Sequence, residues 1–485
     1  MKISPHPDWA TRFRKPGTEL RLINGYYYLY SVSTSWDKVT KTSKKITGKL
    51  LGKITEKDGF VESDKMKLMR KHSIENYNLA VREFGASDFI FSNNKDILEK
   101  LKNFFPDNWL EIACMAFFRL SYQSPIKNLQ HYYEHSYLSV LNQKTSITDK
   151  KISAMLRYIG KNRNLSVEFM KSFSHIGDYV LIDMTNVITK SKHIDLAAVG
   201  YNSKREYDPQ VNLMLIYSST LNEPVYYRIV PGNIREVKSF ELSLRESGIN
   251  DAILISDKGF VSEKNIVDLD KSALRYILPL RRNSSLIDYN PLAVESKRNM
   301  HGYFKFEDRY IWYYQKQQDK KNIIIYLDDK LKSEEETDYL NRISSHPENY
   351  AIDEFKEKYV TMGTITVITN ITNMNAEDIF AAYKTRYKIE QMIDVMKNIV
   401  ESDKTYMQDA DALEGWFFVN YVALLFYFRI YKLLVNKKML SKCSVKDLIT
   451  ILTEIKRVKI DDTWHLAEIN SKNQKLYDKL SIYIT

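Results

Sequence analysis

The spacing of apolar residues changes character several times along the chain. Short apolar and aromatic runs punctuated by glycines predict strands over residues 19–60. From about 76 to 175, apolar residues recur every three or four positions, as in DILEKLKNFF and WLEIACMAFFRLSY. This spacing predicts helices, with breaks at Pro106 and Pro125.

Beyond residue 175 the pattern becomes that of an α/β protein. The run YVLIDMT predicts a buried strand that ends on Asp183, and the runs at 211–219 and 225–232 predict two more strands. A helix end, a strand at 252–256 and a sharp turn carrying Asp257 follow. Three adjacent strands, a crossover helix and a fourth strand indicate an α/β sheet.

Residues 283–363 interrupt this alternation. YFKFEDRYIWYYQ and NIIIYLDD predict antiparallel strands and KSEEETDYLNRI predicts a charged helix, so we interpret this stretch as an insertion. A fifth core strand is predicted at 363–372, and a continuous helix from about 376 to 398 follows it, capped by Asn375. The apolar helix predicted at 416–434 is expected to pack beneath the core, with a dimer interface as the alternative.

Composition narrows the class of protein. The 485 residues are 44% apolar and 27% charged, as in ordinary globular proteins. The two cysteines, Cys114 and Cys443, cannot build a disulfide framework and lack metal-site spacing. The first residues contain no apolar signal segment, and the apolar stretch 416–428 is too short to span a bilayer. We therefore expect a soluble protein of a reducing compartment.

The chain has a formal net charge of +11, which is compatible with solubility alone and with a polyanionic partner. Two segments are dense in basic residues. The first predicts either a solvated hairpin edge or a phosphate-contacting arm, and the second predicts either a wall of a DNA channel or a loop without contacts. The first contains Lys38, Lys41, Lys44, Lys45, Lys49 and Lys53, and the second Lys190, Lys192, His193, Lys204 and Arg205.

The helix predicted at 376–398 carries an unusual set of side chains on one face. Tyr383, Arg386, Glu390 and Lys397 fall within an arc of roughly 60° at about 100° per residue. Taken alone, they are explained by a solvent-exposed face with an Arg386–Glu390 ion pair. Asp394 lies on the same side of the helix and rivals Glu390 as a metal ligand on geometry alone.

Two acids at predicted strand ends change this interpretation. Asp183 and Asp257 each end an apolar strand, where α/β sheets place their functional sites. With Glu390 they would form a carboxylate cluster that repels itself unless a cation neutralises it. All-oxygen ligands suit Mg²⁺ or Mn²⁺. Two such ions, about 3.5–4 Å apart, can activate an attacking oxygen and stabilise the leaving one in phosphoryl transfer.

These motifs resemble those of the DDE transposases of bacterial and archaeal insertion sequences, which have an RNase H-like core. The spacing of Tyr383, Arg386, Glu390 and Lys397 matches the Y-(2)-R-(3)-E-(6)-K signature of one group without a gap. Asp183 begins a D-x-T motif, and the sequence Asp257, Lys258, Gly259, Phe260 fits D-x-G-F. The pair Gly232 and Asn233 also fits the family pattern. The three acids are separated by 74 and 133 residues, and the longer interval suits a β-rich insertion. The resemblance covers about 175–435.

The resemblance implies roles for these residues. Asp183, Asp257 and Glu390 would be catalytic and would hold two Mg²⁺ (or Mn²⁺) ions per active site. Tyr383, Arg386 and Lys397 would contact phosphates of the transposon end, and Lys258 would also contact DNA. The implied reaction is hydrolysis at the end of the element, followed by attack of the freed 3′-hydroxyl on target DNA.

Trp312 has two interpretations. Some relatives pass through a hairpin intermediate and flip a base onto an aromatic residue of the insertion, and Trp312 would be such a stacking platform. Its aromatic neighbours Tyr310, Tyr313 and Tyr314 instead favour the core of a small β domain, which we consider the better explanation.

The predicted fold class is α/β, with an RNase H-like mixed five-stranded sheet and helices, a β-rich insertion, a small N-terminal β region and a helical domain. The predicted domains are an N-terminal β-rich basic region (1–75), a helical DNA-binding domain (76–175), a catalytic core in two parts (176–282 and 364–435), the insertion (283–363) and a C-terminal region (436–485).

The expected partner is double-stranded DNA, both transposon ends and target, bound by a homodimer in the cytoplasm of a prokaryote. The alternatives are a catalytically inactive DNA-binding derivative and an RNase H-like nuclease that cuts without joining.

Overall fold

A computed structural model describes the chain over most of its length. The described residues are 6–37, 41–67, 79–173, 179–200, 208–232, 237–249, 253–256, 258, 261–293, 297–400 and 402–484. The chain divides into two compact units, one formed by residues 1–80 with 459–464 and the other by residues 81–458 with 465–485.

The first unit is built on a four-stranded antiparallel sheet in the order β1-β2-β3-β4. Its elements are α1 (Asp8–Thr11), β1 (Thr18–Ile23), β2 (Tyr26–Asp37), β3 (Thr42–Thr55) and β4 (Gly59–Glu62). A small core packs around Leu29 and Ile54. These strands confirm the prediction for residues 19–60.

The basic hairpin of this unit has partners of its own. Lys45 forms an ion pair with Glu19 at 3.1 Å, and the Lys53 ammonium lies 3.3 Å from the ring centroid of Tyr26. Lys44 and Lys49 are exposed on β3, and Lys38 lies outside the described residues. Exposed lysines on a hairpin fit both interpretations of this segment, which therefore both stay predictions.

The second unit begins with helices that follow the predicted spacing. They are α3 (Gly85–Asn93), α4 (Lys95–Phe104), α5 (Trp109–Tyr122), the 3₁₀ turn η2 (Ile126–Asn128), α6 (Leu129–His135), α7 (Leu138–Leu141), α8 (Asp149–Lys161) and α9 (Arg163–Lys171). Near the C-terminus lie α17 (Val445–Thr453) and α18 (Ser471–Leu480). Three further strands, β5 (Leu79–Glu83), β16 (Lys456–Ile460) and β17 (Thr463–Leu466), contain residues of both units.

A ten-stranded mixed sheet forms the centre of the second unit within the described residues. Its order is β11-β12-β13-β14-β10-β9-β6-β7-β8, with β15 beside β6. The strands are β6 (Tyr179–Thr189), β7 (Gln210–Ser218), β8 (Glu223–Pro231), β9 (Ile253–Ile255), β10 (Arg275–Leu280), β11 (Gly302–Phe306), β12 (Arg309–Gln318), β13 (Lys321–Asp328), β14 (Thr364–Thr369) and β15 (Lys404–Thr405). Every residue of β7 is buried, which accounts for its unbroken apolar run.

This sheet is larger than the expected five strands. The insertion does not form a separate β domain, because β13 pairs with β14 and β14 pairs with β10. Strand β10 was not predicted; it runs parallel to β9 and separates it from β14. The predicted antiparallel hairpins of the insertion are confirmed by the pairing of β11, β12 and β13.

Helices pack around the sheet and join its strands. They are α10 (Val237–Ser247), α11 (Glu263–Lys271), the 3₁₀ turn η4 (Asn290–Leu292), α12 (Asp329–Ser345), α13 (Ile352–Tyr359), α14 (Ala376–Lys384), α15 (Tyr387–Asp394) and α16 (Ala410–Asn436). The charged helix expected near 332–343 is α12, and the side chain of Asn375 caps α14, as predicted, by accepting from the Asp378 N–H at 2.7 Å.

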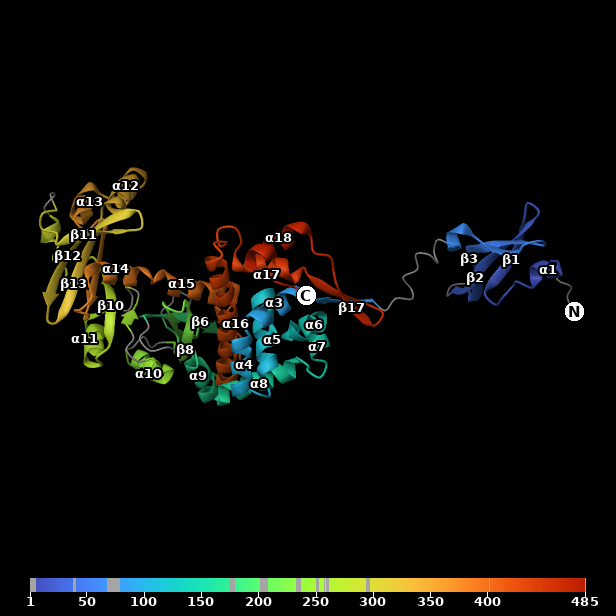
Figure 1. Ribbon diagram of the computed structural model, residues 1–485, viewed down its shortest axis with the longest axis horizontal. Coiled ribbons are helices and arrows are strands. Elements are labelled where there is room, and N and C mark those ends of the chain that lie inside the picture. The colour runs from blue at the N-terminus through green and yellow to red at the C-terminus, as the bar shows by residue number, and fades with distance from the viewer. Residues whose placement is uncertain are drawn as a thin grey trace. The chain divides into compact units, whose positions relative to one another are not determined.

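Helix α16 lies between the sheet and the helical region (Figure 1) and packs against β8, α5 and α8. The prediction that this segment packs in the core is confirmed, because Phe418, Val422 and Phe426 are completely buried. Among the described residues it is the one helix long and apolar enough to cross a membrane, and 72% of its apolar window is buried inside the protein, as in a core helix.

Candidate functional site

Asp183 lies in the middle of β6 and not at its end, which corrects the sequence prediction. The strand continues to Thr189 because it pairs with β7 along its whole length, from Val180 opposite Ser218 to Ile188 opposite Gln210. The Asp183 side chain is half-buried, and its Oδ1 accepts from the Met184 N–H at 2.8 Å.

The second acid, Asp257, lies outside the described residues, as do Gly259 and Phe260. The strand before it is described. Ile255, the last residue of β9, pairs with Leu181 of the parallel strand β6. Strand β6, which contains Asp183, and strand β9, which precedes Asp257, are therefore neighbours in the sheet, and their pairing is described as far as Leu181 and Ile255.

Gly232 occupies a crowded position after β8. A Cβ atom there would lie 2.0 Å from the carbonyl oxygen of Gln210 and 2.7 Å from that of Ala198, so only glycine fits. Its predicted companion Asn233 lies outside the described residues.

The predicted helix at 376–398 is not continuous. Helix α14 ends at Lys384, and i→i+3 hydrogen bonds such as Arg386 N–H to Tyr383 O at 3.1 Å tighten the turn before α15. After Asp394 a π-helical segment, η5 (Val395–Ile399), carries Lys397. These changes of pitch alter the uniform spacing of about 100° per residue from which we predicted that Tyr383, Arg386, Glu390 and Lys397 share one helix face.

The four signature residues differ in burial. Tyr383 is buried, Arg386 and Lys397 are half-buried, and Glu390 is exposed. Arg386 Nη1 donates to Glu390 Oε1 at 2.6 Å, so the i,i+4 pair considered above is present. Helix α15 packs against β6 and β7, which places Glu390 on a helix that contacts the strand of Asp183.

A cavity of about 370 Å³ opens beside this turn, and we refer to it as the basic cavity. It brings together three residues predicted to contact DNA: Lys258, Tyr383 and Arg386. The full lining is Lys258, Leu280, Arg282, Thr364, Ile365, Thr366, Tyr383, Lys384, Arg386 and Tyr387. Four of these residues are cationic and none is acidic, so the cavity favours an anionic ligand.

Sequence reasoning missed Arg282, Thr366 and Lys384 as site residues. Arg282 Nη2 contacts Glu335 Oε1 at 2.9 Å and donates to the Thr364 carbonyl at 3.0 Å. Burial lowers the pKa of Lys384. The sequence could have indicated Lys384, because it directly follows Tyr383. It could not indicate Arg282 or Thr366, which come from segments distant in the sequence.

The donor chemistry suits a hard divalent cation. Asp183 and Glu390 supply carboxylate oxygens, and Glu390 Oε2 accepts no hydrogen bond from the described residues. No group of three potential metal ligands occurs among the described residues, which do not include Asp257. Asp394 is exposed, and its Oδ1 accepts from Asn398 Nδ2 at 2.5 Å.

Trp312 lies on β12 opposite Tyr303 of β11, with ring centroids 5.1 Å apart, and the Lys297 ammonium lies 4.9 Å from its ring centroid. Tyr303 and Tyr310 are 60% and 59% exposed, whereas Trp312 is half-buried. This aromatic face is thus partly open to solvent. In the other predicted basic segment, Lys190, Lys192 and His193 are exposed, and Lys204 and Arg205 lie outside the described residues.

Comparison with known proteins identifies a family and similar solved structures. A family described as "Transposase DDE domain" matches residues 176–426. Among solved structures, the chain is similar to a piggyBac transposase in a synaptic complex with hairpin DNA, with 11% identity, a TM-score of 0.38 and 76% of each chain covered. No curated protein sequence matches.

Proposed function

Because this chain belongs to the DDE transposase family, we propose that it is the transposase of an insertion sequence. Membership rests on the match over residues 176–426 and implies phosphoryl transfer on nucleic acid. The proposed reaction is metal-dependent cleavage of double-stranded DNA at the inverted-repeat ends of its element, followed by attack of the 3′-hydroxyl on target DNA.

One observation carries this proposal. Glu390 lies on α15, which packs on the strand of Asp183, and is bonded to Arg386, which lines the basic cavity with Tyr383. A carboxylate suited to a cation and an arginine suited to a phosphate are therefore adjacent. A purely structural ion pair does not require a cationic cavity beside it.

The proposed catalytic residues are Asp183, Asp257 and Glu390, which would hold two Mg²⁺ or Mn²⁺ ions. Bound there, the ions would supply charge stabilisation at the attacking and leaving oxygens. Asp183 is held in place by the Met184 N–H, and Glu390 by Arg386. Arg386, Tyr383, Lys258 and Lys397 would orient the DNA by binding its phosphates.

We further propose that the β8-β7-β6-β9-β10 part of the sheet is the RNase H-like core. Three antiparallel strands are followed there by two strands parallel to β6, which supports this assignment. Trp312 is retained as a proposed base-stacking residue, because its face of β12 is partly open. The helical region at 76–175 is proposed to bind DNA, and the protein to act as a homodimer in the prokaryotic cytoplasm.

The test is incubation of the full chain with Mg²⁺, a target plasmid and labelled duplexes taken from the DNA that flanks its gene. Joined products are expected. Cleavage without joining would overturn the proposal in favour of a nuclease, and binding without cleavage would favour an inactive derivative. A parallel reaction with Ca²⁺ in place of Mg²⁺ controls for contaminating nucleases with other metal requirements.

A further inference from the structure

The positive charges that line the basic cavity are not balanced by acidic residues in the same lining. Arg282 and Arg386 each have a carboxylate partner, Glu335 at 2.9 Å and Glu390 at 2.6 Å, but neither partner lines the cavity. Four cationic side chains therefore face a space without an acidic one. Like charges held this close destabilise one another until an anion neutralises them.

Lys384 is the least compensated of these cations. Among the described residues Lys384 has no ion-pair partner, and its ammonium lies 5.0 Å from the centroid of the Phe380 ring. The charges of Asp328 and Glu307 act on Lys384, but Asp328 Oδ2 contacts Arg309 at 3.0 Å and Asp328 Oδ1 caps α12. The ammonium group thus keeps its hydrogen-bonding capacity for a ligand.

A buried hydroxyl independently indicates a ligand. Thr366 lies on β14 between Leu280 and Ile325 and is only 4% exposed, and its Oγ1 finds no hydrogen-bond partner among the described residues. A buried hydroxyl without a partner costs roughly 1–3 kcal/mol, so such groups are rare unless something binds them. Thr366 lines the basic cavity, where an anion would accept its hydrogen.

We propose that Thr366, Lys384 and Arg282 form a subsite for a backbone phosphate of DNA, beside the phosphate contacts of Arg386 and Tyr383. This inference rests on the proposed function, which provides DNA as the ligand. The volume of about 370 Å³ lies in the range of ligand pockets, roughly 300–1,000 Å³.

The surroundings favour a polymer of phosphates over a free anion. A second cavity of about 480 Å³ shares Lys384 and Tyr387 with the basic cavity. Its lining adds the cations Arg309 and Lys388 and the acids Glu307 and Asp328, of which Asp328 pairs with Arg309 at 3.0 Å. The positive charge of the basic cavity therefore continues into the second cavity through Lys384 and Lys388. A strand of DNA presents phosphates at regular intervals, and a single phosphate ion would use only one end of this arrangement.

The experiment measures binding of a fluorescent mixed-sequence DNA duplex to the full chain in EDTA, across a series of salt concentrations. Without divalent ions no cleavage occurs, so the result is independent of whether the protein transposes. The variants are Lys384→Gln and Thr366→Val. The matched control is Lys356→Gln, which removes a 68% exposed lysine of α13 that lines neither cavity.

Lys384→Gln should bind DNA about tenfold more weakly, with a log–log salt slope smaller by about one. Thr366→Val should bind about fivefold more weakly, while its unfolding midpoint stays unchanged or rises because an unpaired hydroxyl is removed. Lys356→Gln should behave as the parent.

If both cavity variants bind DNA with the affinity and the salt slope of the parent, the proposed phosphate subsite is wrong. A second outcome concerns inorganic phosphate, which would raise the unfolding temperature of the parent if it binds the cavity. If the variants lose this stabilisation but bind DNA as the parent does, the ligand is a free anion and the assignment to DNA is wrong. Failure of the parent to cut DNA in Mg²⁺, with weakened binding in both variants, would overturn the proposed function alone.

Discussion

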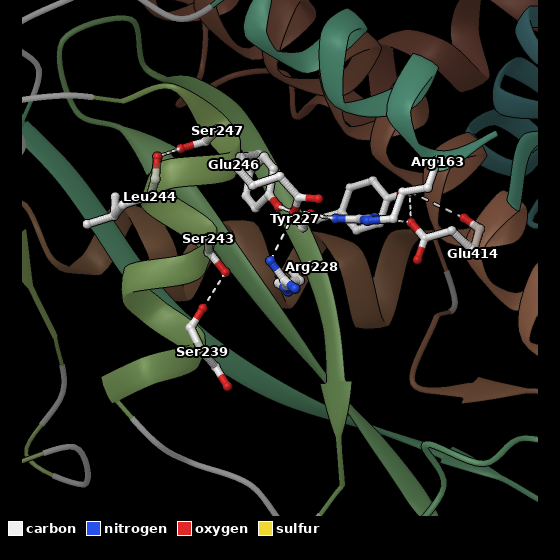
Figure 2. Close-up of polar contacts among 10 residues, drawn as sticks. Arg163, Tyr227, Arg228, Ser239, Ser243, Leu244, Glu246, Ser247 and Glu414 are labelled. Carbon is white, nitrogen blue, oxygen red and sulfur yellow. Dashed lines mark hydrogen bonds and ion pairs between the residues drawn. The ribbon is translucent and has the colours of Figure 1, made fainter. Parts of the chain in front are cut away.

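Two arginine–glutamate clusters in the second unit use the same chemistry in opposite ways. In the first (Figure 2), Arg163 of α9 pairs with Glu414 of α16 and, at 3.2 Å, with Glu246 of α10. Buried Tyr226 and Tyr227 donate to the same two carboxylates. In the second, Arg386 and Glu390 form one pair beside the basic cavity.

The difference lies in how completely the charges are satisfied. Arg228 adds a contact to Glu246 at 3.1 Å, and the Glu414 side chain is only 12% exposed. Glu390, by contrast, is 51% exposed and has one oxygen without a partner among the described residues. A closed cluster holds elements together, whereas an open pair can exchange its partner for a metal ion or a phosphate.

The closed cluster should dominate stability. Arg163→Ala leaves the Glu414 carboxylate without a cation and Glu246 with Arg228 alone, so we expect a loss of about 2–3 kcal/mol in the free energy of unfolding. The shift of the urea midpoint measures it. Arg245→Ala, which breaks the exposed Arg245–Glu241 pair of α10, is the control and should cost about 0.5 kcal/mol or less. Equal losses in the two variants would contradict the distinction.

Glu246 gives this cluster a pH dependence. Burial acts to raise its pKa, but the Tyr226 hydrogen bond and the charges of Arg163 and Arg228 outweigh it, so the pKa is lowered. The contribution of Glu246 is therefore present above the ordinary glutamate range and is lost as the pH falls through the lowered pKa. Urea unfolding of Glu246→Gln at several pH values should show lower stability at neutral pH and a flatter acid limb. An acid limb identical to that of the parent would show that Glu246 does not contribute.

The open pair should matter little for stability. Arg386→Ala should change the free energy of unfolding by about 0.5 kcal/mol or less, while DNA affinity falls about tenfold because a phosphate contact is lost. Arg342→Ala removes a comparable i,i+4 pair, Arg342–Asp338 at 2.8 Å on α12, and is the control for stability. It should leave DNA binding unchanged. A large stability loss in Arg386→Ala with parental DNA affinity would reverse the assignment.

Local patterns in the sequence predicted only part of the fold. The apolar runs at 211–219 and 416–434 identified β7 and α16 because every residue of β7 is buried and α16 is buried continuously over residues 415–428. Strand β10 was missed because Pro279 lies within it, and proline argues against a paired strand. The extension of β6 beyond Asp183 was missed because Thr185 and Asn186 interrupt the apolar run there. The strand nevertheless continues, because β7 pairs with these residues.

The candidate site was predictable only in part. The signature spacing selected Tyr383 and Arg386, and the D-x-G-F motif contains Lys258; the structure brings all three to one cavity. It did not show the tightened turn between α14 and α15, which arises from i→i+3 hydrogen bonds at Thr385 and Arg386. It also could not find Arg282 or Thr366, because their proximity depends on the pairing of β10 with β14.

The most direct measurement compares Glu390→Gln with Asp394→Asn, two carboxylates of the same helix, in Mg²⁺-dependent cleavage of duplexes carrying the ends of the element. Each variant is also tested for DNA binding in EDTA. If Glu390 is the metal ligand, Glu390→Gln should reduce cleavage by about a thousandfold or more while retaining DNA binding, and Asp394→Asn should cut within a few-fold of the parent. Cleavage by Glu390→Gln at the parental rate, or its loss in Asp394→Asn alone, would contradict the account.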